Sequence, residues 1–250
     1  DQQKDKKSWD FPGGPMVRIL SFYCKAQGFP QRLRAVLFDM DGTLVDNSAV
    51  HVDAFELFCA RYGVTDWREK LNRAFGMGSD DIMRMLLPEE VIRERGLKAL
   101  GDEKEAIYRE IYAPTIRPVA GLRTLLTLLC EAGIRCAVGS SGCRENVEFV
   151  LEKCQIGEFF EERISGDMVT RCKPEPEIYI TAAKSLGVKI EECIIFEDAR
   201  AGFEAARRAE AGLIVGISTT LPKAIIEAEH LADLVVEDFT EIDSLSKLLK

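Results

Sequence analysis

The sequence predicts an α/β protein with a doubly wound, mainly parallel sheet, into which a small all-helical domain is inserted. Three observations predict this fold. Short apolar runs end abruptly at polar residues or glycine, helical patterns separate the runs, and a long stretch of helical patterns without strands follows the first run. Strands of a parallel sheet are buried on both faces and are therefore apolar throughout. Their alternation with helices is typical of a doubly wound sheet.

The predicted strands are four short runs of the sequence. The first covers residues 35–38 and stops at Asp39. The other three cover 135–139, 193–196 and 213–216. Helical patterns lie at 121–132, 144–153, 177–186 and 200–211, and glycines at 133, 187 and 212 follow three of them as stop signals.

The helical insertion follows directly after the polar end of the first strand. Residues 52–62, 67–74, 80–86, 89–97 and 103–112 read as successive helices, and Pro114 and Pro118 mark the exit. We therefore divide the chain into an N-terminal extension (1–32), a Rossmann-like α/β core (33–47 and 116–250) and a helical domain (48–115).

Composition excludes several classes of function. The 250 residues are 46% hydrophobic and 30% charged, as in a water-soluble globular protein, and no apolar stretch is long enough for a membrane span. The net charge of -9 argues against nucleic acid as a partner. The eight cysteines form no metal-binding spacing, which indicates reduced thiols in a cytoplasmic protein, with Cys136 and Cys193 as small buried hydrophobes. A monomer is favoured.

Charged and hydroxyl side chains gather where the predicted strands end. Ligands of open parallel sheets bind beyond the carboxyl ends of the strands. One polar strand end is also consistent with an ordinary solvated loop, but several in order favour a site. The residues at these ends are Asp39, Asp41, Ser140, Ser141, Glu197 and Asp198, and Lys173 lies in a proline-rich segment before the last pair.

Several carboxylates at one place require a cation, and oxygen ligands favour a hard divalent ion, here Mg²⁺. One carboxylate of the first strand end can attack phosphorus, and the second can move protons. Lys173 and Ser140 can neutralise phosphate oxygens. The pattern therefore predicts phosphoryl transfer on a small-molecule phosphate ester.

The segments Asp-Met-Asp-Gly-Thr-Leu-Val-Asp (39–46), Gly-Ser-Ser (139–141), Lys-Pro (173–174) and Phe-Glu-Asp (196–198) resemble the four motifs of the haloacid dehalogenase superfamily of phosphatases and phosphomutases. The resemblance extends from residue 33 to the C-terminus and implies a Rossmann-like core with a helical cap. It implies Asp39 as nucleophile and Asp41 as general acid/base. It also implies Mg²⁺ held by Asp39, the Asp41 carbonyl and Asp198, with Glu197 nearby. Phosphate would be anchored by Ser140, Ser141 and Lys173.

The insertion resembles the cap of the β-phosphoglucomutase-like subgroup. His51 falls where those mutases carry a histidine that helps to toggle the acid/base residue, although a helix-surface histidine is an equal alternative. The loop from Gly76 carries Ser79 where the mutases place a phosphate-gripping arginine. Lys104 matches a further cap ligand or, more simply, is an exposed helix lysine. Arg144 meets a distal anion or is a surface residue of the next helix.

Three functions are consistent with these residues. The first is a phosphatase acting on a small monoester such as a sugar phosphate. The second is a phosphomutase, which His51 favours and Ser79 disfavours. The third is a binding protein without activity, which the complete set of catalytic residue types disfavours.

Overall fold

The computed structural model of the protein describes residues 33–73 and 79–249, so the predicted extension 1–32 lies outside the described residues. Six parallel strands form one sheet in the order β3-β2-β1-β4-β5-β6. Their bounds are Ala35–Phe38 (β1), Arg135–Gly139 (β2), Glu162–Ile164 (β3), Cys193–Glu197 (β4), Leu213–Ile217 (β5) and Leu234–Val236 (β6).

The four predicted strands are β1, β2, β4 and β5, and the structure confirms them. The two edge strands, β3 and β6, were not predicted. Each has only three residues, and β3 begins with the partly exposed Glu162 and Arg163. A strand at the sheet edge needs no apolar run, because one side of it meets solvent.

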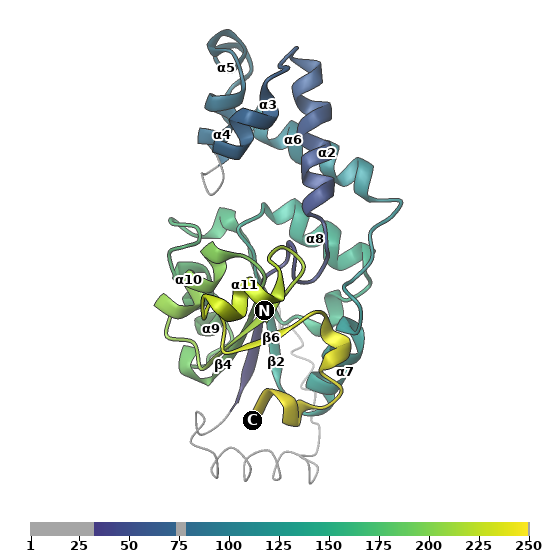
Figure 1. The fold of residues 1–250 in the computed structure, drawn as a ribbon, viewed down its shortest axis with the longest axis vertical. Helices are drawn as coiled ribbons and strands as arrows, with labels where there is room; N and C mark the ends of the chain where they lie inside the picture. The colour runs from purple at the N-terminus through teal and green to yellow at the C-terminus, as the bar shows by residue number, and fades with distance from the viewer. Residues whose placement is uncertain (1–32, 74–78, 250) are drawn as a thin grey trace, which may run out of the picture.

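Alternating residues of β1 face the two halves of the core. Val36 and Phe38 belong to one buried apolar cluster, and Ala35 and Leu37 belong to another. The first cluster is covered by α7 (Leu122–Glu131) and α8 (Arg144–Lys153). The second is covered by α9 (Glu177–Ser185), α10 (Arg200–Arg208) and the unpredicted short helix α11 (Lys223–Ala228). Helices thus lie on both faces of the sheet, and the doubly wound fold is confirmed (Figure 1).

Five helices follow β1 and stand above the sheet in Figure 1. Their bounds are Ser48–Arg61 (α2), Trp67–Arg73 (α3), Ser79–Leu86 (α4), Glu89–Arg95 (α5) and Leu97–Tyr112 (α6). The structure confirms the predicted helices, although α6 begins six residues earlier than expected. Apolar side chains of α2 and α6 join the same cluster as Phe38, so the cap packs on the core. The exact division at residues 48 and 115 stays a prediction.

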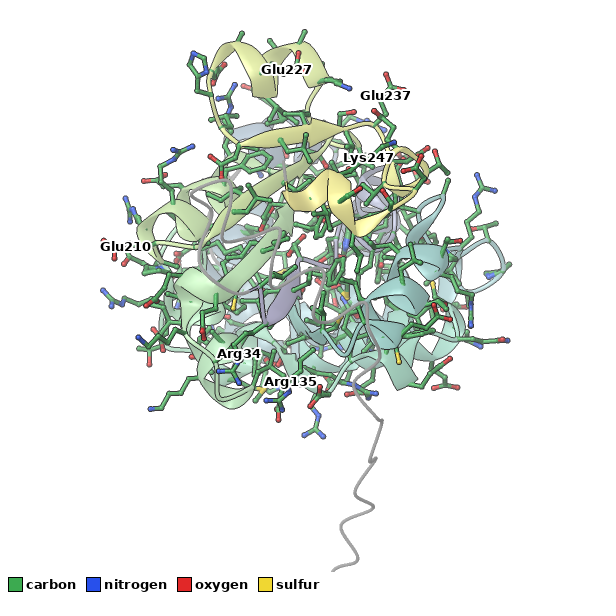
Figure 2. The ribbon with its side chains drawn as sticks, turned by 90° about the horizontal axis from the view of Figure 1, so that it is seen from below. Arg34, Arg135, Glu210, Glu227, Glu237 and Lys247 are labelled. Carbon is green, nitrogen blue, oxygen red and sulfur yellow. The ribbon has the colours of Figure 1, made fainter. Side chains whose placement is uncertain are left out.

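The end of the sheet away from the cap carries exposed ion pairs. Figure 2, seen from below, shows Arg34 and Arg135 beside each other, and the Arg135 amide donates to the Arg34 carbonyl at 3.2 Å. Arg135 also binds Glu161 through two guanidinium nitrogens. Within the described ranges, no helix has the length and apolar character needed to cross a bilayer.

Cys136 and Cys193 are buried on strands, as predicted. Burial raises the pKa of the Cys193 thiol to about 12, and the nearby Glu192 carboxylate adds to this shift. The thiol therefore stays protonated and acts as a small apolar side chain.

Gly121, at the start of α7, packs closely against the C-terminal segment. It has a φ of +79°, and a Cβ there would collide with the backbone of Phe239 and Thr240. Gly133 has a similar φ of +68° with no atom within 4 Å of such a Cβ. Gly133→Ala should cost roughly 1–2 kcal/mol of unfolding free energy through left-handed strain alone, and Gly121→Ala should cost more. Urea denaturation measures both, and equal costs would contradict the packing argument.

Candidate active site

The loop after β1 places Asp39 and Asp41 at the carboxyl edge of the sheet. The amides of Leu44 and Thr43 both donate to the Met40 carbonyl, at 2.9 and 3.2 Å. The Gly42 amide donates to the Val45 carbonyl at 2.7 Å. This tight loop turns the chain back immediately after the strand and fixes the two carboxylates at the sheet edge.

Lys173 lies between two buried carboxylates. Its Nζ donates to Asp39 Oδ1 at 2.5 Å and to Glu197 Oε1 at 2.6 Å. The Lys173 side chain is only 7% exposed. Burial alone would lower the pKa of Lys173, but the two carboxylates outweigh it and raise that pKa. Lys173 is therefore a permanently charged ammonium in the site.

Glu197 accepts hydrogen bonds from four groups. Besides Lys173, they are the Tyr179 hydroxyl at 2.5 Å and the backbone amides of Asp198 and Ala199 at 3.0 and 3.4 Å. A Cβ on Gly202 would collide with the same carboxylate, so only glycine fits there. Sequence reasoning missed Tyr179. A signal was available, because a tyrosine on the buried face of a helix needs a partner for its hydroxyl.

The carboxylates of Asp39, Glu197 and Asp198 form a cluster suited to a cation. Their ligand atoms lie within 4.8 Å of one another. Burial raises the pKa of Asp39, Lys173 opposes this shift, and Glu197 and Asp198 add to it. Burial and Glu197 raise the pKa of Asp198 to about 8.

Asp198 Oδ1 is the atom that fits a metal best. It is buried and has no hydrogen-bond partner within the described part of the chain. A buried carboxylate oxygen without a donor is costly unless a cation binds it. Because Glu197 is already fully hydrogen-bonded, Asp198 and Asp39 are the better direct ligands of a hard divalent ion.

Asp41 is held by groups at the entrance to the cap and in its first helix. Its Oδ1 accepts from Asn47 Nδ2 at 2.6 Å, and His51 Nε2 lies 3.6 Å from the same oxygen. Asn47 Nδ2 also lies 2.7 Å from the Tyr108 hydroxyl. Burial would raise the pKa of Asp41, but His51 and Asn47 outweigh it and lower that pKa. Sequence reasoning missed Asn47 and Tyr108, because their contacts exist only once α2 and α6 pack together.

The expectation that Lys104 is an exposed helix lysine is wrong. Its residue is 3% exposed, and its Nζ lies 3.0 Å from His51 Nδ1 and donates to Glu105 at 2.8 Å. His51 stacks on the Tyr108 ring with a centroid distance of 4.0 Å. Packing of α2 against α6 brings Lys104 onto His51 and buries the lysine. The pattern of a single helix does not reveal a contact between two helices. His51 is therefore linked to Asp41 rather than being an isolated surface histidine.

The two predicted phosphate-anchoring serines differ in position. Ser140 is fully buried, and its Oγ accepts from the Gly142 amide at 3.0 Å. Ser141 is exposed and lines a cavity of about 580 Å³ together with Asp39, Asp41, Lys173, Glu197 and Asp198. The cavity volume lies in the range of small-molecule sites. The serine roles stay predictions.

The remaining residues predicted to contact the substrate do not lie at one place. Ser79, at the start of α4, lines the same cavity as the carboxylates. Arg144 is exposed in the first turn of α8, its amide donates to Asp167 at 2.6 Å, and it lines another hollow. This position agrees with the surface alternative. Gly76 lies outside the described residues.

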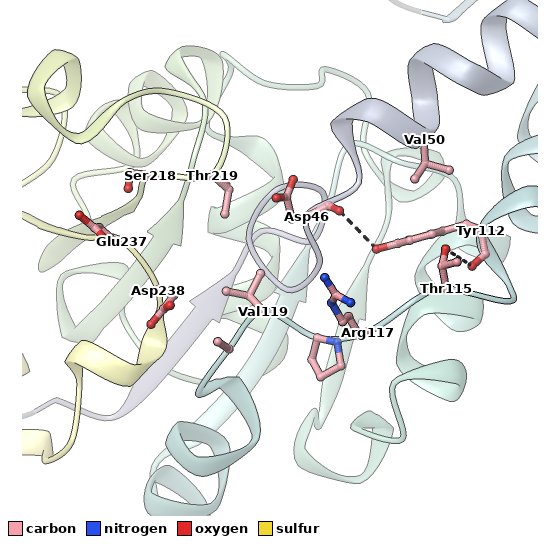
Figure 3. Close-up of a pocket in the computed structure, with 12 residues that line it drawn as sticks. Asp46, Val50, Tyr112, Thr115, Arg117, Val119, Ser218, Thr219, Glu237 and Asp238 are labelled. Carbon is pink, nitrogen blue, oxygen red and sulfur yellow. Dashed lines mark hydrogen bonds between the residues drawn. The ribbon is translucent and has the colours of Figure 1, made fainter.

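A larger cavity of about 710 Å³ lies beside the start of α2 (Figure 3). Asp46, Tyr112, Arg117 and Asp238 are among the residues that line it, and the Tyr112 hydroxyl lies 3.5 Å from the Asp46 carbonyl oxygen. None of the predicted site residues lines it. Size therefore does not identify the site, and the clustered chemistry of the smaller cavity does.

Asp198→Asn should raise the free energy of unfolding of the metal-free protein at pH 8 by at least about 1.4 kcal/mol, which is the energy equivalent of one pKa unit. The pKa of Asp198 is raised in the folded state, so folding binds a proton, and stability falls as pH rises from about 4 through 8. At pH 4 the folded carboxyl is neutral and the benefit should vanish. Urea denaturation in EDTA at both pH values measures this, and an equal effect at both would contradict the buried-charge argument.

Comparison with known proteins gives the family. Residues 36–215 match the haloacid dehalogenase-like hydrolases. A phosphorylated carbohydrates phosphatase of Thermotoga maritima is 27% identical over 84% of this chain and 98% of its own. A β-phosphoglucomutase of Mycobacterium bovis is 27% identical over 94% and 99%. A crystal structure of a family IA hydrolase from Entamoeba histolytica has a TM-score of 0.75 at 25% identity, over 86% and 97% of the two chains. The chain is therefore an enzyme of the haloacid dehalogenase-like hydrolase family, of the kind that includes phosphatases and phosphoglucomutases.

Proposed function

We propose that the protein is a Mg²⁺-dependent phosphatase that hydrolyses a small phosphate monoester, such as a sugar phosphate, through an aspartyl phosphate on Asp39. One observation carries the proposal: Asp39, Asp41, Lys173 and Asp198 line one cavity of about 580 Å³ at the carboxyl edge of the sheet. They supply a nucleophile, an acid/base group, a cation and a metal ligand.

In the first step, a carboxylate oxygen of Asp39 attacks phosphorus and the ester P–O bond breaks. Asp41 enters this step protonated, although His51 and Asn47 lower its pKa in the free protein, and the leaving alkoxide takes that proton, so an alcohol and an acyl phosphate form. Lys173, 2.5 Å from Asp39, lies where it can neutralise charge on the transferring group.

In the second step, water attacks the phosphorus of the acyl phosphate. Asp41 takes a proton from this water, the bond to Asp39 breaks, and inorganic phosphate leaves. Asp39 and Asp41 return to their starting states. Asn47 and His51 keep the Asp41 carboxylate in place through both steps.

Mg²⁺ bound by Asp39, the Asp41 carbonyl and Asp198 would neutralise phosphate oxygens during transfer. The orphan Asp198 Oδ1 and the raised pKa of Asp39 and Asp198 support this ligand set. Glu197 would orient Lys173 and complete the acidic shell.

We also infer a cytoplasmic protein whose partner is a small phosphate ester. The seven cysteines of the described residues are free thiols, as a reducing compartment requires. The net charge of -9 disfavours nucleic acid.

Asp39→Asn should lower the rate of phosphate release from a sugar-phosphate panel by at least about 10³-fold, because an amide is a poor nucleophile. EDTA should silence the unchanged enzyme, and Mg²⁺ should restore it. Phosphate release is followed by colorimetry, and circular dichroism checks folding.

Asp53→Asn is the matched control, because Asp53 is an exposed aspartate of α2. It should retain full activity. A near-normal rate for Asp39→Asn would refute the nucleophile. A folded protein that releases no phosphate from any ester would instead favour the third function, a binding protein without activity.

A phosphomutase is the second candidate, and the contact of half-buried His51 with buried Lys104 beside Asp41 favours it. A mutase must deliver the phosphoryl group to a sugar hydroxyl instead of water, and it gains from tight control of the acid/base residue. The test is β-glucose 1-phosphate primed with the bisphosphate. We expect inorganic phosphate as the product, and glucose 6-phosphate as the main product would establish the mutase.

Lys104→Met should lower kcat about tenfold with little change in KM, because Lys104 holds His51 toward Asp41 and does not line the cavity. Methionine has a similar length and can pack its thioether on the Phe55 ring, which the Lys104 ammonium now covers at 4.4 Å. Lys98→Met, at an exposed lysine of the same helix, is the control and should be neutral. Steady-state phosphate release measures both, and a change in KM alone would contradict a role in positioning.

A further inference from the structure

We infer that the substrate carries its single phosphate on a neutral, hydroxylated carbon skeleton, and that a second phosphate or a carboxylate is rejected. The inference rests on the proposed phosphatase function and narrows it to a substrate class. It comes from the charges that line the 580 Å³ cavity.

Outside the carboxylates and Lys173, the described residues that line the cavity are small and uncharged. Ser79, Ser141 and Thr170 provide hydroxyls. The other lining residues are Cys172, Ala199, Ala201 and Gly202. Hydroxyls can both donate to and accept from the hydroxyls of a polyol or sugar, whereas they offer no charge to a second anion.

Among the described residues that line this cavity, Lys173 is the one cation, and it is already bound by Asp39 and Glu197. Four carboxylates line the same space. Asp41 begins the proposed reaction protonated, so Lys173 and a divalent metal ion together only balance the other three carboxylates. The transferring phosphate adds negative charge to this balanced site, and no cation of the described lining is left for another anion.

Three basic residues close to the cavity have carboxylate partners. Arg171 pairs with Glu175 and Glu177, and Arg200 pairs with Glu229. Lys104 is held by Glu105. These arginines and Lys104 would have to give up carboxylate partners to reach a substrate.

An anionic group on the substrate would therefore lose its hydration and gain no ion pair. A hydroxyl in the same place would exchange hydrogen bonds with water for hydrogen bonds with Ser79, Ser141 or Thr170. The cavity thus discriminates by charge at the part of the substrate that does not react.

The test compares substrates that differ in one terminal group. Glucitol 6-phosphate and 6-phosphogluconate share a six-carbon chain and differ by a hydroxymethyl against a carboxylate. Fructose 6-phosphate and fructose 1,6-bisphosphate differ by one phosphoryl group. We expect kcat/KM to favour the neutral member of each pair at least about tenfold. The preference should shrink as KCl is raised, because salt screens the repulsion.

Ser79→Arg should restore activity on the acidic members, because α4 presents position 79 to the cavity. The ratio of kcat/KM for 6-phosphogluconate over glucitol 6-phosphate should rise at least about fivefold, since one added cation offsets the repulsion. Ser79→Gln adds length without charge and is the matched control. Its ratio should stay within about twofold of the unchanged enzyme.

The outcomes separate the inference from the function beneath it. Equal or faster turnover of the acidic members would overturn the neutral-substrate inference and leave the phosphatase intact. A shift in the ratio for Ser79→Gln equal to that for Ser79→Arg would overturn the charge argument. No phosphate release from any of the four esters, at rates above Asp39→Asn, would overturn the proposed function and the inference together.

Discussion

The ion cluster of Lys173 with Asp39 and Glu197 is the interaction on which the rest of the site depends. Three charges share a buried space, and each would be costly there alone. Parallel pairing of β1 with β4 sets Phe38 opposite Phe196, so the carboxylates that follow them emerge side by side. The lysine arrives from the segment before α9. The sheet therefore buries two carboxylates side by side. The ammonium of Lys173, from another segment of the chain, offsets part of their negative charge.

Lys173 offsets only part of this negative charge, and a bound metal ion would neutralise the remainder. Asp198 keeps one buried oxygen without a donor, and its pKa is raised to about 8 by burial and by Glu197. Without another cation these buried carboxylates take up protons at neutral pH, so a metal ion bound there would replace those protons. Under the proposed function, the same shortage of cations would limit what the cavity accepts. A phosphate would add its charge to a site where Lys173 and a bound metal ion already face carboxylates, so the rest of the substrate would meet hydroxyls.

The core of the site could be predicted from the sequence because its signals are local. Asp39 and Asp198 each follow an apolar run that can only be a buried strand, and parallel strands bring such ends together. The sequence does not reveal that Lys104 is buried, since this depends on α6 packing against α2, where His51 lies 53 residues earlier. Edge strand β3 is not predicted from the sequence either, because its partly exposed residues form no apolar run.

Asp41 connects the two halves of the molecule. Its position in the chain belongs to the loop after β1, but its oxygen is held by Asn47 and faced by His51, at the entrance and in the first turn of α2. Asn47 is itself 1% exposed and lies 2.7 Å from the Tyr108 hydroxyl of α6. Any change in the packing of α2 on α6 must therefore reach the Asp41 carboxylate through two short contacts. Asp39 has no such link to the cap among its hydrogen bonds within the described residues. Under the proposed mechanism the cap would therefore act on proton transfer at Asp41, while the core alone would hold the nucleophile.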